Sequence, residues 1–151
     1  MCNYENLLHD ANMMGLEVKE VDFASCAKGL CKGEKIGIRK EMPRNEKACI
    51  LAEEIGHYYT TVGDITDQRD TGNRKQEIKA RKWAVDKMIQ IEDLFRAAAQ
   101  PCQNIYEIAE YLEVTEPFLL EALDVFKKRY GASYTYNGKT IVFYDYGFCV
   151  K

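Results

Sequence analysis

The sequence predicts an α+β fold, in which a small sheet and a long helix come first and further helices and a β-hairpin follow. Residues 35–39 alternate apolar and polar side chains, which is typical of a half-buried strand. Residues 46–55 and 74–91 carry apolar side chains at helical spacing. Near the end of the chain, Asn137-Gly138 separates two runs rich in aromatic and β-branched residues, which indicates a type I′ hairpin.

Length, composition and net charge indicate a small globular protein. The chain has 151 residues, of which 46% are hydrophobic, enough for one well-packed domain and a small appendage. A formal net charge of −3 argues against nonspecific nucleic-acid binding. We expect no membrane segment and a cytoplasmic location, because no run of 18 apolar residues and no signal peptide is visible. The six cysteines are therefore expected to be reduced rather than paired.

The first third of the chain predicts one helix and a small sheet. Residues 3–14 place apolar side chains on one helical stripe. Residues 16–21 and 35–39 are predicted strands, and the segment between them, with Gly29 and Gly33, is predicted to be a loop.

Two longer helices are predicted in the middle of the chain. Asn45 is the expected N-cap of a helix that opens at Glu46. The polar segment 63–73 is expected to be a loop, and helices are expected at 74–91 and 94–99. We place a domain boundary here, with a core at 1–99 and an appended segment at 100–151 that is expected to pack on the core as one compact unit.

The appended segment is predicted to be helix-turn-helix-like, followed by the hairpin. Residues 104–112 and 117–123 have helical patterns, and Thr115 is the expected N-cap of the second helix. The strands of the hairpin are expected at 132–136 and 139–144.

Direct DNA binding by this segment is the less favoured interpretation. The second helix carries Glu116, Glu121 and Asp124 where a reader of DNA needs cationic or amide side chains. A helical packing module accounts for the pattern without nucleic acid.

The segment Glu53-Glu54-Ile55-Gly56-His57 is the strongest indication of chemistry. It has the form of a HExxH zinc motif in which Glu53 replaces the first histidine. Glu53 and His57 are four residues apart and share one helical face, and a carboxylate is a legitimate zinc ligand. Glu54 keeps the position of the general base. Taken alone, the pattern also fits a solvated helix face.

A third metal ligand must come from another element. Glu77 is the best candidate, because it shares a helix face with the small Ala80, which permits close packing against the motif helix. His9 on the first helix is a weaker alternative, for which a surface position is the commoner outcome.

The carboxylate at position 53 affects the metal that we expect. Two carboxylates nearly cancel the charge of the ion, so Zn2+ would be a weaker Lewis acid, and Mn2+ or Fe2+ also become candidates. Tyr58 or Tyr59 could donate to an oxyanion, although a core or rim position is the favoured interpretation for each.

Three segments together resemble the ImmA/IrrE family of phage and mobile-element metallopeptidases. They are residues 49–60, Gly63-Asp64-Ile65 and residues 77–84. The resemblance spans about residues 15–130. It implies a zincin-like minimal core, with metal ligands Glu53, His57 and Glu77 and catalytic base Glu54.

The resemblance also implies a function. It predicts a zinc-dependent endopeptidase that uses metal-activated water to cleave or inactivate a helix-turn-helix repressor of a phage or mobile element. The replacement at Glu53 favours an alternative, a catalytically inactive relative that binds and sequesters such a repressor. A DNA-binding regulator is the third possibility.

Overall fold

The computed structural model describes residues 3–60, 71–101 and 104–151. Its contacts divide the chain into an N-terminal unit, Cys2–Met88, and a C-terminal unit, Ile89–Lys151, and each is described by itself. Residues 89–99 thus group with the C-terminal unit, whereas the sequence assigned them to the core; the predicted domain boundary after residue 99 stays a prediction. The described elements confirm a mixed α+β fold with two small sheets.

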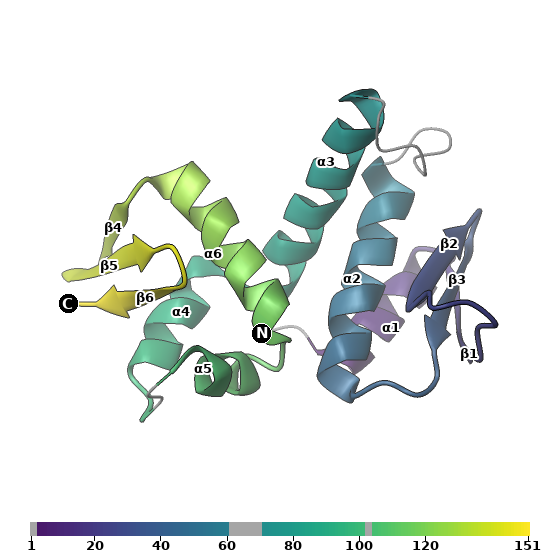
Figure 1. The fold of residues 1–151 in the computed structure, drawn as a ribbon, viewed down its shortest axis with the longest axis horizontal. Coiled ribbons are helices and arrows are strands. Elements are labelled where there is room, and N and C mark those ends of the chain that lie inside the picture. Colours follow the sequence, from purple (N-terminus) through teal and green to yellow (C-terminus); the bar gives the residue numbers. More distant parts are fainter. Residues whose placement is uncertain (1–2, 61–70, 102–103) are drawn as a thin grey trace. The chain divides into compact units, whose positions relative to one another are not determined.

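The N-terminal unit contains a three-stranded sheet with β3 at its centre (Figure 1). β3 (Lys35–Arg39) pairs in parallel with β1 (Glu17–Val21) and antiparallel with β2 (Gly29–Lys32). The central strand contributes Ile36 and Ile38 to the core, both at most 1% exposed.

The strand β2 corrects the prediction of a loop around Gly29. A two-residue turn at Gly33 and Glu34 joins β2 to β3, and Lys32 pairs with Lys35 across it. Gly33 has a φ of +61°, a backbone conformation that glycine adopts without strain. The hairpin was missed because β2 is short and does not show a clear alternation of apolar residues.

The helix α2 (Arg44–Thr60) lies between the sheet and α3 in the N-terminal unit (Figure 1). It also packs against α1 (Tyr4–Met13). Its buried side chains face these neighbours on more than one side, which explains its lack of a single apolar stripe. They are Ala48, Cys49, Leu51, Ala52 and Ile55.

The boundaries of α2 and α3 differ from the predicted ones. α2 begins at Arg44 rather than after an N-cap at Asn45, and the amide of Lys47 donates to the carbonyl of Pro43. α3 (Thr71–Met88) begins before the predicted residue 74 and ends before the predicted residue 91. Of the predicted loop at 63–73, residues 63–70 lie outside the described residues.

The early end of α3 follows from the start of the next helix. α4 (Ile91–Ala98) begins directly after Gln90, whose backbone amide donates to Asp93 Oδ2 over 2.8 Å. This contact satisfies a backbone donor at the helix start, so α4 begins at Ile91 rather than at the predicted residue 94, and α3 ends before it.

The helices of the C-terminal unit agree with the predicted pattern. α5 (Ile105–Tyr111) and α6 (Glu116–Tyr130) occupy the two expected positions. Thr115 caps α6 by accepting a hydrogen bond from the amide of Phe118 over 3.3 Å. Whether this pair acts as a helix-turn-helix stays a prediction.

The second sheet contains the predicted hairpin and one further strand. β4 (Ser133–Tyr136) pairs with β5 (Lys139–Tyr144), and β6 (Gly147–Val150) adds to the other edge of β5. Asn137 and Gly138 have φ angles of +49° and +76°, which confirms the type I′ turn. The strand β6 was not predicted.

Two further findings concern membrane-spanning helices and cysteine pairing. Within the described ranges, no helix combines the length and the apolar run that crossing a bilayer requires. Among the cysteines in those ranges, Cys26, Cys31, Cys49 and Cys149, the structure shows no disulfide. Cys2 and Cys102 lie outside the described residues.

Candidate metal centre

The site is built on the close contact between α2 and α3. Gly56 of α2 lies against the backbone of Ala80, and a Cβ at position 56 would be only 2.5 Å from the carbonyl oxygen of Ala80. The absence of a side chain at Gly56 therefore lets the two helices approach at backbone distance. Ala80 and Ala84 of α3 are buried, as their small size predicted.

The helix contact brings His57 and Glu77 together. Nε2 of His57 lies 3.6 Å from Oε2 of Glu77. Their side chains are 21% and 27% exposed, so solvent reaches both. The other ring nitrogen of His57, Nδ1, is buried and has no hydrogen-bond partner among the described residues. A buried polar atom without a partner destabilises the fold unless a bound group or water satisfies it.

Glu53 lies one helical turn before His57 and is partly buried. Its negative charge acts on its neighbour Glu54, whose carboxyl it makes harder to ionise. In the described ranges, no three His, Cys, Asp or Glu side chains come close enough together to hold an ion. The role of Glu53 as the first ligand therefore stays a prediction.

The spacing of His57 and Glu77 suits two ligands of one divalent cation. Two ligand atoms of a tetrahedral zinc, each about 2.1 Å from the ion, lie about 3.4 Å apart. The observed separation of 3.6 Å is close to that value and is too long for a good hydrogen bond. One imidazole and one carboxylate from two packed helices are also a donor set that zinc, manganese and iron accept.

Glu54 lies beside this pair and is held in a largely buried environment. Burial, and to a smaller extent the negative charges of Glu53 and Glu77, raise the pKa of the Glu54 carboxyl to about 7. The backbone amide of Cys31 donates a hydrogen bond to the carboxylate, which acts in the opposite direction. A carboxyl with a pKa near neutrality can both accept and donate a proton, as a general acid-base group must.

Gly29 and Cys31 are neighbours of Glu54 that the sequence did not reveal. Both lie on β2, the strand that was predicted as a loop. A usable signal was present, because two short runs separated by Gly33-Glu34 are typical of a hairpin. What a sequence pattern does not contain is the contact of this hairpin with α2.

The predicted oxyanion donors lie on the exposed end of α2. Tyr58 is 36% exposed and Tyr59 51%. The ring of Tyr59 stacks on Trp83 of α3 with 5.6 Å between ring centroids, and Tyr58 packs edge-on against Tyr59. The stack gives Tyr59 a packing role at the rim of the helix pair, and the role of either hydroxyl in chemistry stays a prediction.

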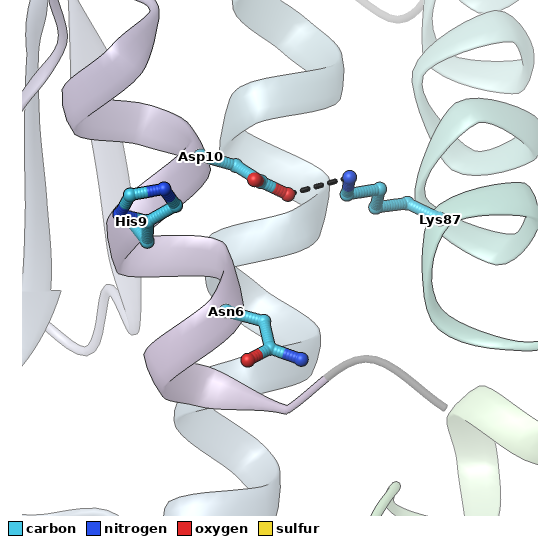
Figure 2. Close-up of a pocket in the computed structure, with 4 residues that line it drawn as sticks. All are labelled: Asn6, His9, Asp10 and Lys87. Carbon is cyan, nitrogen blue, oxygen red and sulfur yellow. Dashed lines mark ion pairs between the residues drawn. The ribbon is translucent and has the colours of Figure 1, made fainter.

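His9 lies in a different part of the N-terminal unit. It lines an open hollow of about 380 Å³ with Asn6, Asp10 and Lys87 (Figure 2). The ion pair between Asp10 and Lys87, at 2.5 Å, joins α1 to α3 there. Lys87 is ten residues beyond Glu77, about 15 Å along the helix, so this hollow is separate from the His57–Glu77 pair.

Comparison with known proteins adds one finding. The model of the family described as the IrrE N-terminal-like domain, Peptidase_M78, matches residues 13–124. This match covers more than half of the chain and includes all four predicted site residues. No curated protein and no solved structure matches the chain.

Proposed function

The chain belongs to the Peptidase_M78 family, the IrrE N-terminal-like domain, and on this premise we propose that it is a metal-dependent endopeptidase. The observation that carries the proposal is the approach of His57 and Glu77 to 3.6 Å, together with the effect of the Glu77 charge on the largely buried carboxyl of Glu54. Glu53, His57 and Glu77 would hold the ion, with the last two supported by their geometry and Glu53 by the motif.

The chemistry divides between the ion and Glu54. A bound cation would act as a Lewis acid toward the scissile carbonyl and lower the pKa of water. Glu54 removes a proton from the attacking water while the oxygen of that water forms a bond to the carbonyl carbon. The same carboxyl then gives the proton to the departing amine nitrogen as the C–N bond breaks. A pKa of about 7 suits both directions of transfer.

We propose a helix-turn-helix repressor of a phage or mobile element as the substrate. This part of the proposal derives from the family resemblance of the motifs at 49–60 and 77–84. A protein substrate requires an open site, and the partial exposure of His57 and Glu77 is consistent with that requirement.

Incubation of the purified protein with the candidate repressor tests the function. Fragments should appear with added zinc or manganese, and both a chelator and Glu54→Gln should abolish them. The Glu54→Gln variant must keep its metal content, so that loss of cleavage reports the proton transfer. Cleavage that persists in Glu54→Gln would contradict the assigned base.

Sequestration of the repressor without cleavage is the second candidate function. The replacement of the first motif histidine by Glu53 favours it, because two carboxylates leave the ion with little positive charge. In this case the repressor would lose its operator DNA on addition of the protein and yet remain intact. Glu53→His then provides a direct comparison, since it restores the usual ligand and should increase cleavage if the ion is the limiting factor.

A further inference from the structure

We propose that Gly29 and the backbone amide of Cys31, both on β2, form a cradle that positions the carboxyl of Glu54. This inference rests on the proposed function, in which Glu54 is the general base. Neither residue contacts substrate in the proposal, and both act through Glu54.

The first half of the cradle is the space that Gly29 leaves. A Cβ at position 29 would lie 3.0 Å from Oε1 and 3.1 Å from Cγ of Glu54. It would also lie 2.5 Å from Cγ2 of Ile50, one turn earlier on α2. The strand therefore approaches the helix so closely that any larger residue must displace one of these side chains. The backbone φ of Gly29 lies outside the left-handed region, so the requirement for glycine comes from space and not from backbone conformation.

The second half of the cradle is a directed hydrogen bond. The amide of Cys31 donates to the Glu54 carboxylate, two residues along the same strand from Gly29. Gly29 and Cys31 are two residues apart on β2, and each is in contact with Glu54, so both features of the strand meet α2 at the same side chain. Because β2 is held to β3 by its own pairing, the amide is a fixed donor rather than a mobile side chain.

The two features restrict different motions of Glu54. The amide fixes one side of the carboxylate, and the wall of β2 at Gly29 limits how the side chain can rotate. Rotating the Ile50 side chain away is energetically costly, because its Cγ2 is attached at Cβ and β-branched side chains in helices have one strongly preferred rotamer. A Cβ at position 29 should therefore push β2 away from α2 at Ile50 and shift the Glu54 side chain by a few tenths of an ångström. Both movements lengthen the hydrogen bond from Cys31 to Glu54.

The amide of Cys31 gives a readout of this contact in metal-free protein. In isotope-labelled wild type at a fixed, mildly alkaline pH, its proton should resonate downfield. Glu54→Gln should move it upfield and Glu54→Ala should move it further. Gly29→Ala should reproduce the upfield shift with Glu54 still present. The control is Gly147→Ala, a strand glycine at which a Cβ meets nothing within 4 Å.

Activity provides the second readout. Gly29→Ala should lower kcat about 100-fold with KM unchanged, because a small misplacement of a catalytic group has effects of that size. Gly147→Ala should leave both unchanged. If Gly29→Ala does not fold, the double variant Gly29→Ala/Ile50→Ala removes the closest contact and should still show the upfield shift.

The outcomes separate the cradle from the proposed function. An identical Cys31 resonance in wild type and Glu54→Ala would overturn the hydrogen bond. An unshifted resonance in folded Gly29→Ala or in the double variant would overturn the role of Gly29. Absence of cleavage by the wild type would instead contradict the enzyme, and the amide readout would still decide whether β2 holds Glu54.

Discussion

Among individual residues, His57 and Glu77 have the most direct support as metal ligands. They come from two helices, lie 3.6 Å apart, and remain accessible to solvent. We expect His57→Ala and Glu77→Ala each to lower zinc affinity by more than about 100-fold, since loss of even an indirect partner has effects of 10- to 100-fold. Titration calorimetry on metal-free protein measures this.

A control distinguishes ligation from damage to the fold. His9→Ala removes the other histidine, which lines a separate hollow, and should bind zinc as the wild type does. Unchanged zinc binding in His57→Ala would exclude that residue as a ligand.

Glu54 makes a prediction about pH in the metal-free protein. Its folded-state pKa is raised from the model-compound value of 4.5 to about 7, chiefly by burial. The unfolded chain therefore releases this proton at lower pH than the folded one, and the stability present below pH 4.5 is lost as the pH rises to about 7. The loss should be at most about 3 kcal/mol.

Glu54→Gln tests that assignment because glutamine does not titrate. Urea unfolding at several pH values should show a smaller decrease in the free energy of unfolding for Glu54→Gln than for wild type across this window. Parallel profiles for the two proteins would place the pH dependence elsewhere.

Among the elements, the contact between α2 and α3 depends on Gly56. A Cβ there would meet the carbonyl oxygen of Ala80 at 2.5 Å, and a backbone atom cannot rotate away. Gly56→Ala should therefore destabilise the protein by about 1–3 kcal/mol. It should do so even though alanine is the better helix former by about 1 kcal/mol.

The same substitution should weaken zinc binding, because separating the helices separates His57 from Glu77. Urea unfolding and calorimetry on the one variant measure both effects. Gly147→Ala, which has open space at its Cβ, is the control for the chemical change alone. A free energy of unfolding equal to that of wild type in Gly56→Ala would mean that α2 and α3 can accommodate a Cβ between them.

The start of α6 depends on the side chain of Thr115. Its hydroxyl oxygen accepts from the amide of Phe118, so Thr115→Ala leaves a helical donor unsatisfied. We expect a loss of about 1 kcal/mol in the free energy of unfolding. Thr115→Ser keeps the hydroxyl oxygen and should therefore retain most of the wild-type free energy of unfolding. Equal losses of stability in Thr115→Ala and Thr115→Ser would mean that the cap contributes little.

At the scale of the whole molecule, the net charge argues against nonspecific binding of nucleic acid. The net charge is −3, and α6 presents acidic side chains, of which Glu116 and Asp124 are exposed. We expect no measurable duplex DNA affinity by fluorescence anisotropy at moderate salt. Affinity that falls steeply with added salt would contradict this.

A positive control uses the same helix. Glu116→Lys/Asp124→Lys changes the sign of two exposed side chains of α6, and should gain weak, salt-sensitive binding. A gain in the variant alone would show that charge, and not the arrangement of α5 and α6, excludes DNA.

The sequence by itself determined the local features of this protein. Propensities over a few residues predicted the turn at Asn137-Gly138, the cap at Thr115 and the positions of α5 and α6. The motif spacing likewise placed Glu53, Glu54 and His57 on one helix, because four residues make about one turn. The boundaries of α2 and α3 were less accurate, since helix ends depend on contacts that periodicity does not report.

Only the tertiary structure decided how these elements meet. The pairing with β3 identifies β2 as a strand. The contact of β2 with α2 places Gly29 and Cys31 around Glu54. The distance between His57 and Glu77 likewise depends on how closely Gly56 lets α3 approach. The physical reason is that a sequence pattern records which side of an element is buried, whereas the partner on that side is chosen by packing between segments far apart in the chain.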